Sequence, residues 1–195
     1  MKFAEFSIDK SILKAVAEER FHTATLVQQK AIPLVLAKEN VIVSAQTGTG
    51  KTAAFALPII QLLSEKASEE KSVKKIKSVI ITPTRELAIQ ILEKFTNYSK
   101  YTNLATTAVF GGVSLAPQKE LLAEGIDILI ATPGRLIDLI ERGEINLKQL
   151  KTIVLDEADE MLSMGFKQDL NRILKYTSGS ANTWLFSATM PDEIQ

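Results

Sequence analysis

The sequence of 195 residues contains no cysteine and a single histidine, and these absences exclude several kinds of site. Without cysteine the chain forms no disulfide and no thiolate metal site, and one histidine cannot build a histidine-rich metal cluster. Any metal that binds must therefore be held by oxygen. The chain also lacks an excess of either charge, with 23 Lys+Arg against 23 Asp+Glu. A polyanion such as nucleic acid would have to be bound by locally placed donors, because no field of the whole molecule attracts it.

Long hydrophobic runs are absent as well. No stretch of about 18 consecutive apolar residues is present, and the first residues (MKFAE) lack the apolar core of a secretory signal. We therefore expect a cytoplasmic, monomeric chain that does not engage a membrane. Hydrophobic residues make up 46% of the chain, which at this length is enough to bury one continuous core. The sequence predicts a single domain.

What the chain does have is a regular alternation of short apolar runs and longer segments of helical period. Runs such as Ile128–Ile130 and Ile153–Leu155 are apolar at consecutive positions, as in strands that helices bury on both faces. We therefore predict an α/β fold with a mostly parallel sheet and helices on both faces. The predicted strands are Val41–Ala45, Ser78–Thr82, Leu104–Phe110, Asp127–Ala131, Thr152–Leu155 and Thr183–Ser187. The predicted helices are Lys10–Glu19, Leu26–Lys38, Lys51–Leu63, Arg85–Lys100, Val113–Leu122 and Pro133–Arg142, and the charged segment Ser64–Ser78 is predicted to be a surface connection.

A glycine-rich segment, AQTGTGKT at residues 45–52, follows the first predicted strand and precedes a helix. It matches the phosphate-loop pattern GxxxxGK[ST] except that Ala45 replaces the first glycine. Gly48 and Gly50 let successive N–H groups point into one concavity, where Lys51 reaches the β- and γ-phosphates and the Thr52 hydroxyl ligates Mg²⁺. An ordinary glycine-rich turn is the alternative, which the flanking strand and helix disfavour. The predicted nucleotide contacts here are Gln46, Thr47, Gly48, Thr49, Gly50, Lys51 and Thr52.

Two adjacent acids, Asp156 and Glu157, follow the apolar strand that ends at Leu155. A carboxylate at the end of a buried strand is how phosphate-loop enzymes hold Mg²⁺, so Asp156 is the predicted metal carboxylate, partly through water. Glu157 leaves the strand in another direction and is predicted to orient or deprotonate the attacking water. The alternative is that both acids only cap the following helix.

Together, AQTGTGKT and Asp156-Glu157-Ala158-Asp159 resemble the DEAD-box RNA helicases of superfamily 2. The remaining motifs of that family's amino-terminal domain follow in order, and the resemblance spans nearly the whole chain. They are Pro83–Ala88, Gly111-Gly112, Thr132–Arg135 and Ser187–Thr189. The resemblance implies that residues 1–195 are the RecA-like P-loop NTPase domain of a helicase, which binds ATP and Mg²⁺. It also implies a second helicase domain, which supplies arginine fingers and lies outside this chain.

Residues 20–28 resemble the adenine-reading Q motif of the same family. The resemblance implies that Phe21, Thr25 and Gln28 contact the nucleotide, together with Phe6 at the place of a separate upstream aromatic residue. A glutamine amide satisfies both the exocyclic donor and the ring acceptor of adenine, so ATP is expected over GTP. Arg20 and Ala24 depart from the usual glycine and proline, which affects the turn before the helix that carries Gln28.

Two predicted strands end in turns that contain proline and arginine and lead into helices. Because the carboxyl ends of parallel strands share one edge of the sheet, these turns should lie beside the phosphate loop. Arginine, threonine hydroxyls and backbone N–H groups suit phosphates and sugars without reading sequence. Locally, ordinary strand-to-helix turns are an equal alternative. The resemblance favours RNA, and it alone selects RNA over DNA; the implied contacts are Pro83, Thr84, Arg85, Gly111, Gly112, Thr132, Pro133, Gly134 and Arg135.

The Ser-Ala-Thr segment at residues 187–189 ends the last predicted strand. We expect Ser187 and Thr189 to hydrogen-bond Asp159 and to pass on the state of the nucleotide, although bonds to nearby backbone are equally compatible with the local pattern. The resemblance implies ATP hydrolysis by in-line attack of water, coupled to local unwinding of RNA. Two alternatives remain: a nucleotide-dependent RNA clamp with little turnover, and a P-loop ATPase that acts on protein or DNA.

Overall fold

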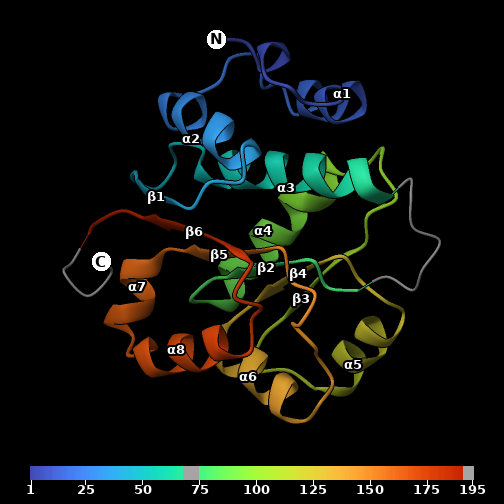
Figure 1. Cartoon of the computed structure of the whole chain (residues 1–195), viewed down its shortest axis with the longest axis vertical. Helices are drawn as coiled ribbons and strands as arrows, with labels where there is room; N and C mark the ends of the chain where they lie inside the picture. The colour runs from blue at the N-terminus through green and yellow to red at the C-terminus, as the bar shows by residue number, and fades with distance from the viewer. Residues whose placement is uncertain (68–74, 191–195) are drawn as a thin grey trace.

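The computed structural model describes residues 1–67 and 75–190, which form a six-stranded sheet covered by helices (Figure 1). The strands are β1 (Val41–Ser44), β2 (Ser78–Ile81), β3 (Thr106–Val109), β4 (Ile128–Ala131), β5 (Thr152–Asp156) and β6 (Asn182–Ser187). Their spatial order is β1-β6-β5-β2-β4-β3, and every pair between neighbouring strands is parallel. The predicted parallel sheet is therefore confirmed.

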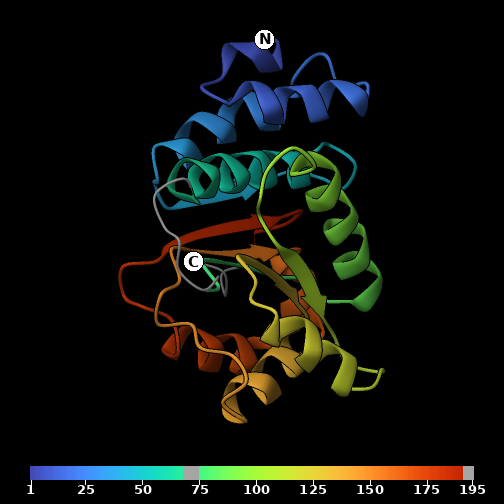
Figure 2. The same ribbon diagram turned by 90° about the vertical axis from the view of Figure 1, so that its right-hand side faces the viewer.

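Helices lie on both faces of this sheet, as predicted. Figure 2 shows α1, α2 and α3 stacked above the sheet and α6 and α8 below it. The helices are α1 (Lys10–Glu18), α2 (Leu26–Leu36), α3 (Lys51–Ala67), α4 (Arg85–Tyr98), α5 (Ala116–Ala123), α6 (Pro133–Glu141), α7 (Ala158–Ser163) and α8 (Lys167–Lys175), and a short 3₁₀ helix spans Phe3–Glu5. No helix among the described residues is both long and apolar enough to cross a bilayer.

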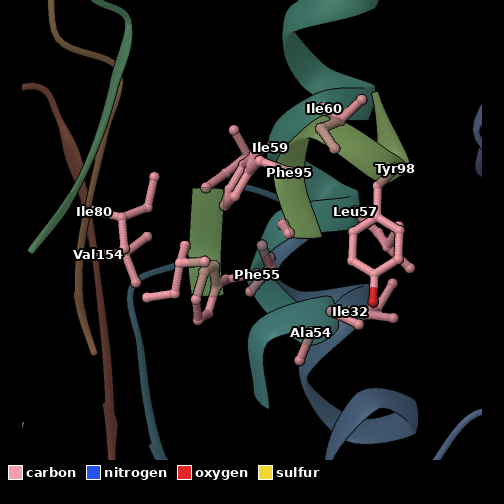
Figure 3. Packing of buried hydrophobic residues seen from close by; sticks show 14 of the residues in the cluster. Ile32, Ala54, Phe55, Leu57, Ile59, Ile60, Ile80, Phe95, Tyr98 and Val154 are labelled. Carbon is pink, nitrogen blue, oxygen red and sulfur yellow. The ribbon is translucent and has the colours of Figure 1, made fainter. Parts of the chain in front are cut away.

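The core consists of two apolar layers, one on each face of the sheet. On β2, Ile80 packs into one layer and Val79 into the other, so the strand is buried along its whole length. Figure 3 shows the first layer, where Ile80 and Val154 of the sheet face Phe55 of α3. The rings of Phe55 and Phe186 meet edge to face with centroids 5.1 Å apart. Burial on both faces explains why these strands are apolar at consecutive positions.

Several predicted boundaries were wrong. Helix α3 continues to Ala67, so the predicted surface connection does not begin at Ser64; residues 68–74 of it lie outside the described residues. The Gln61 side chain donates to Glu65 Oε1 at 2.6 Å, an i,i+4 contact that supports this last turn. Helix α5 begins at Ala116 rather than Val113, with a proline in its first turn. Helices α7 and α8 were not among the predicted helices. They have six and nine residues and are separated by only three, so neither gives a long periodic pattern.

All six strands point the same way, so their carboxyl ends meet at one edge of the sheet. The phosphate loop leaves this edge after β1, and Asp156 ends β5 beside it. Strand β6 runs between them and pairs Ser187 with Ser44 of β1. The turns after β2, β3 and β4 leave the same edge farther along the sheet. The fold thus brings the predicted motifs together in the order of the strands.

Candidate nucleotide and nucleic-acid site

The phosphate loop has the curled backbone that its glycines allow. Gly48 and Gly50 have φ angles of +80° and +89°, a region that other residues rarely adopt. Two carbonyl groups of the loop accept hydrogen bonds from α2 and its N-cap. Thr25 Oγ1 donates to Thr49 O at 2.8 Å, and Gln28 Nε2 donates to Gly50 O at 3.1 Å. The first N–H groups of α3 have no intrahelical partners. The loop therefore has N–H donors available for an anion.

Beside the loop, a lysine and two acids lie close together. Lys51 Nζ is 3.1 Å from Glu157 Oε1, an ion pair whose alignment is too poor to give Nζ a good hydrogen bond. Asp156 is buried, and its Oδ1 has no hydrogen-bond partner among the described residues. Burial, followed by the negative charge of Glu157, raises the pKa of Asp156 to about 7, although Lys51 opposes the shift. Glu157 itself has a left-handed backbone (φ 54°, ψ 49°), the kind of strain that gathers at functional sites.

A cavity of about 540 Å³ opens over the loop and the acids. It brings together most of the predicted nucleotide contacts: Phe21, Thr25, Gln28, Thr47, Gly48, Gly50, Lys51, Thr52, Asp156 and Glu157. Three predicted contacts do not line it. Phe6 is only 7% exposed and packs against Phe3, with ring centroids 6.2 Å apart. Gln46 and Thr49 lie in the loop, where the Thr49 hydroxyl donates to the Gln46 carbonyl at 2.7 Å.

The Gln28 amide lies between the cap of α2 and the loop. Its Oε1 accepts from the Thr25 N–H at 2.9 Å, while its Nε2 donates to Gly50 O. A primary amide has two hydrogens and two lone pairs on its oxygen, so one donor and one acceptor remain. The amide can thus hold the loop and still make a pair of hydrogen bonds to a ligand.

The cavity also has a wall that contains none of the predicted nucleotide contacts. It consists of side chains from α4, namely Leu87, Gln90, Ile91, Glu93, Lys94 and Tyr98. Residues 87, 91, 94 and 98 recur every three or four positions and so share one helix face. That spacing is visible in the sequence, but nothing local says that this face borders the phosphate loop. Lys94 Nζ lies 2.9 Å from Glu19 Oε2 and 5.8 Å from the centroid of the Phe21 ring.

A second hollow, an open groove of about 460 Å³, lies farther along the same edge of the sheet. Its lining contains six of the predicted RNA contacts, namely Pro83, Arg85, Gly111, Thr132, Gly134 and Arg135, together with Asp138 and Phe166. Phe166 belongs to none of the predicted motifs. The predicted contacts Thr84, Gly112 and Pro133 do not line the groove. The Thr84 hydroxyl instead caps α4 by accepting from the Leu87 N–H at 3.3 Å. Thr132 is the N-cap of α6, but its side chain makes no cap hydrogen bond.

Asp159 is hydrogen-bonded to the end of β6, as expected. The Thr189 hydroxyl and N–H donate to Asp159 Oδ2 at 2.8 and 2.9 Å. The Asp159 N–H in turn donates to Ser187 Oγ at 3.1 Å. Burial acts to raise the pKa of Asp159, but the hydrogen bonds of Thr189 and Ser187 outweigh it, and the pKa is lowered. The carboxylate is therefore charged at neutral pH. Its role in passing on the nucleotide state stays a prediction.

An all-parallel sheet, a phosphate loop after its edge strand and a buried carboxylate at the end of the second strand from that edge strand define a RecA-like P-loop domain. The family model of the DEAD/DEAH box helicases matches residues 25–195, and the chain belongs to this family.

Named relatives and solved structures agree with this assignment. The chain is 46% identical over 195 residues to "ATP-dependent RNA helicase CshA" of Limosilactobacillus reuteri, covering all of this chain and 38% of that protein. A crystal structure of a DEAD box protein from Methanococcus jannaschii superposes with a TM-score of 0.91 at 42% identity, over all of this chain and 52% of that one. A structure described as a hypothetical ATP-dependent RNA helicase from Sulfolobus tokodaii superposes with a TM-score of 0.86 at 41% identity. The match covers 96% of this chain and 53% of that one. The chain thus spans less than half of the curated relative's length.

Proposed function

We propose that this chain is the ATP-binding and RNA-backbone-binding domain of an ATP-dependent RNA helicase. The observation that carries the proposal is the 540 Å³ cavity, which joins the phosphate loop, the Gln28 amide and the two acids in one site. The relatives are named as ATP-dependent RNA helicases, which supports the same reaction here. In that role the domain, residues 1–195, works with a second helicase domain. A cytoplasmic location and a monomeric state stay predictions from the sequence.

Adenine recognition rests on Gln28 and Phe21. The free N–H and the free lone pair of the Gln28 amide match the ring acceptor and the exocyclic amine of adenine. Guanine carries an oxygen where adenine carries the amine, so its acceptor would face the amide oxygen. The Phe21 ring is 43% exposed at the cavity wall and offers a surface on which a base can stack. Phe6, which is buried, would have to act through packing.

The triphosphate is bound by the loop and Lys51. A γ-phosphate carries more charge than the Glu157 carboxylate, so it draws Lys51 Nζ away from the ion pair. Thr52 and Asp156 would hold Mg²⁺. They fit it because magnesium prefers oxygen ligands and the buried Asp156 Oδ1 has no partner within residues 1–67 and 75–190. When bound, the ion supplies positive charge that neutralises the phosphates.

Hydrolysis then depends on Glu157. Released from Lys51, its carboxylate accepts a hydrogen bond from a water molecule and orients that water in line with the γ-phosphate. Lys51 stabilises the negative charge of the transferring group. The strained left-handed backbone at Glu157 aims the side chain away from the direction of β5.

RNA binding is assigned to the groove around Arg85 and Arg135. The two guanidinium groups supply donors for phosphates and sugars. So does the Thr132 hydroxyl, which makes no cap hydrogen bond to α6. Arginine and threonine at the starts of helices suit the phosphates and sugars that every RNA sequence shares. The proposed binding is therefore independent of sequence.

A second candidate is a nucleotide-dependent RNA clamp with little turnover. The ion pair between Lys51 and Glu157 favours it, because it occupies both groups that hydrolysis requires. Steady-state ATP hydrolysis by the protein that carries this chain, with RNA, with DNA and without either, separates the candidates. Stimulation by RNA alone supports the helicase. An unstimulated rate together with tight RNA binding supports the clamp, and stimulation by DNA would overturn both.

Two substitutions test the assigned roles. Lys51→Ala should weaken Mg-ATP binding and abolish turnover, because it removes the charge that faces the phosphates. Glu157→Gln should keep nucleotide affinity and slow hydrolysis by about a hundredfold, a typical contribution of general-base catalysis. Glu160→Gln, at an exposed acid on the same helix, is the matched control and should change neither. Normal turnover in Glu157→Gln would assign Glu157 to helix capping.

A further inference from the structure

Gln118 is a buried glutamine that belongs to none of the predicted motifs. It lies in the first turn of α5 and is only 6% exposed. Its Oε1 accepts from the Phe110 N–H at 3.2 Å and from Arg135 Nη1 at 3.1 Å, and its Nε2 donates to the Phe110 carbonyl at 3.1 Å. Both lone pairs of the amide oxygen and one of its hydrogens are therefore used. No other side chain of similar size provides this combination of donor and acceptors.

These bonds connect three segments of the groove. Phe110 directly precedes Gly111 and Gly112, so fixing both polar groups of its backbone fixes the start of that turn. The Phe110 ring lies under the Arg85 guanidinium, whose carbon is 5.4 Å from the ring centroid. Arg135 also donates through Nη2 to the Val113 carbonyl at 2.9 Å, on the far side of the same turn. The amide thus links the turns after β3 and β4, and the Phe110 ring connects them to Arg85 in the turn after β2.

The charges make this arrangement suitable for an anion. Both partners of Arg135 are neutral oxygens, and no carboxylate among residues 1–67 and 75–190 forms an ion pair with it. The acid that lines the groove, Asp138, instead pairs with Arg142 at 2.6 Å. Arg85 lies against an aromatic ring rather than an acid. Gln118 therefore holds Arg135 in place without neutralising its charge, which a glutamate at the same position would do.

We propose that Gln118 is a positioning residue of the RNA groove, whose amide sets the Gly111-Gly112 turn and orients Arg135 toward the RNA backbone. The inference rests on the proposed function, because it assumes that this groove binds RNA. Gln118 itself does not line the groove and acts through its partners.

The test uses Gln118→Met, which keeps the size of the side chain and removes all three hydrogen bonds. Binding of fluorescein-labelled oligouridylate to the 195-residue chain is measured by anisotropy for the wild type, Gln118→Met, Arg135→Met and the double variant. Each single variant should bind about tenfold more weakly, the effect of losing one charge-assisted contact. The double variant should bind RNA far less than a hundredfold more weakly than the wild type, because both substitutions remove the Arg135 contact and only the effect on the Gly111-Gly112 turn is added. Gln149→Met, at an exposed glutamine on the opposite edge, is the control.

Further readouts separate positioning from loss of folding. ATP affinity and the melting temperature should be unchanged in Gln118→Met, while the Phe110 amide should exchange its hydrogen faster with solvent. Additive effects, about a hundredfold in the double variant, or RNA binding equal to that of the wild type would overturn the positioning role. If Gln118→Met has a lower melting temperature than the wild type, RNA binding by the four proteins and the exchange of the Phe110 amide are measured at a temperature where all of them are folded. The same outcomes then support or overturn the positioning role. Wild-type protein that binds no oligouridylate would instead overturn the RNA groove itself, and the inference with it.

Discussion

Gly50 is the residue of the phosphate loop with the least room for a side chain. Its φ of +89° is unfavourable for any L-residue, and a Cβ would lie 2.3 Å from Gln28 Nε2. Gly50→Ala should therefore push Gln28 out of its place and weaken ATP binding by tenfold or more, since strain and a lost hydrogen bond each cost about 1–3 kcal/mol.

The matched comparison for this substitution is Gly48→Ala. It carries a similar φ of +80° but no atom lies within 4 Å of its added Cβ. Titration with ATP and GTP should show that only Gly50→Ala reduces the preference for ATP, because only that variant displaces the Gln28 amide. Equal losses of selectivity in both variants would mean that backbone strain alone is responsible.

The raised pKa of Asp156 should make the stability of the fold depend on pH. Its pKa is about 7 in the folded chain, against 3.8 for a free aspartate side chain. Between these values the folded state binds a proton that the unfolded state has lost, so the contribution of Asp156 to stability decreases as pH rises from about 4 to 7 and is constant above. Asp156→Asn has no such titration. The free energy of unfolding of Asp156→Asn minus that of the wild type should therefore increase by roughly 2–3 kcal/mol from pH 5 to pH 8.

Urea unfolding at the two pH values measures this difference. Glu160→Gln, an exposed acid nearby, should show no comparable change. If the free energies of unfolding of Asp156→Asn and the wild type differ by the same amount at both pH values, Asp156 has an ordinary pKa in the folded chain.

At the scale of elements, α1 and α4 together shape the base end of the cavity. Glu19, the C-cap of α1, accepts from Lys94 at 2.9 Å and from Asn97 at 3.0 Å, both on α4. Lys94 in turn lies over Phe21, the proposed stacking surface. The position of the Phe21 ring thus depends on a contact between two helices that are far apart in sequence.

Lys94→Met should weaken ATP binding by roughly three- to tenfold, because a cation–π contact is worth about 0.5–2 kcal/mol. Binding of pyrophosphate should be unaffected, since the phosphate loop is unchanged. Calorimetric titration of both ligands distinguishes the two effects. The control is Lys100→Met, which removes a lysine that pairs with Glu18 and does not line the cavity. Equal losses for both ligands in Lys94→Met would show that Lys94 acts on the phosphate end.

At the scale of the whole molecule, the two apolar layers share one sheet, so they should unfold together. Trp184, the single tryptophan, is fully buried in β6 and donates to the Glu39 carbonyl at 2.9 Å, which makes it a probe of the sheet. Thermal unfolding of residues 1–195 followed by Trp184 fluorescence and by far-ultraviolet circular dichroism should give coincident transitions. Mg-ATP should raise both midpoints equally, because it binds only the folded state. Separate midpoints would indicate that the helices above and below the sheet fold as different units.

The sequence by itself determined the parallel α/β fold, the order of the motifs and most of the residues at the phosphate end of the cavity. Strands buried on both faces are apolar at consecutive positions, and a phosphate loop needs its glycines, lysine and threonine at fixed spacing, so both leave local patterns. The expected bonds of Asp159 to Ser187 and Thr189 followed from two motifs at the ends of strands.

Only the tertiary structure decided how residues far apart in sequence meet. It placed Lys94 beside Phe21, buried Phe6 against Phe3 and linked Gln118 to Arg135. It also raised the pKa of Asp156, because desolvation depends on everything packed around the carboxyl group. Such contacts and burial arise from the packing of whole elements, which no local pattern of residues encodes.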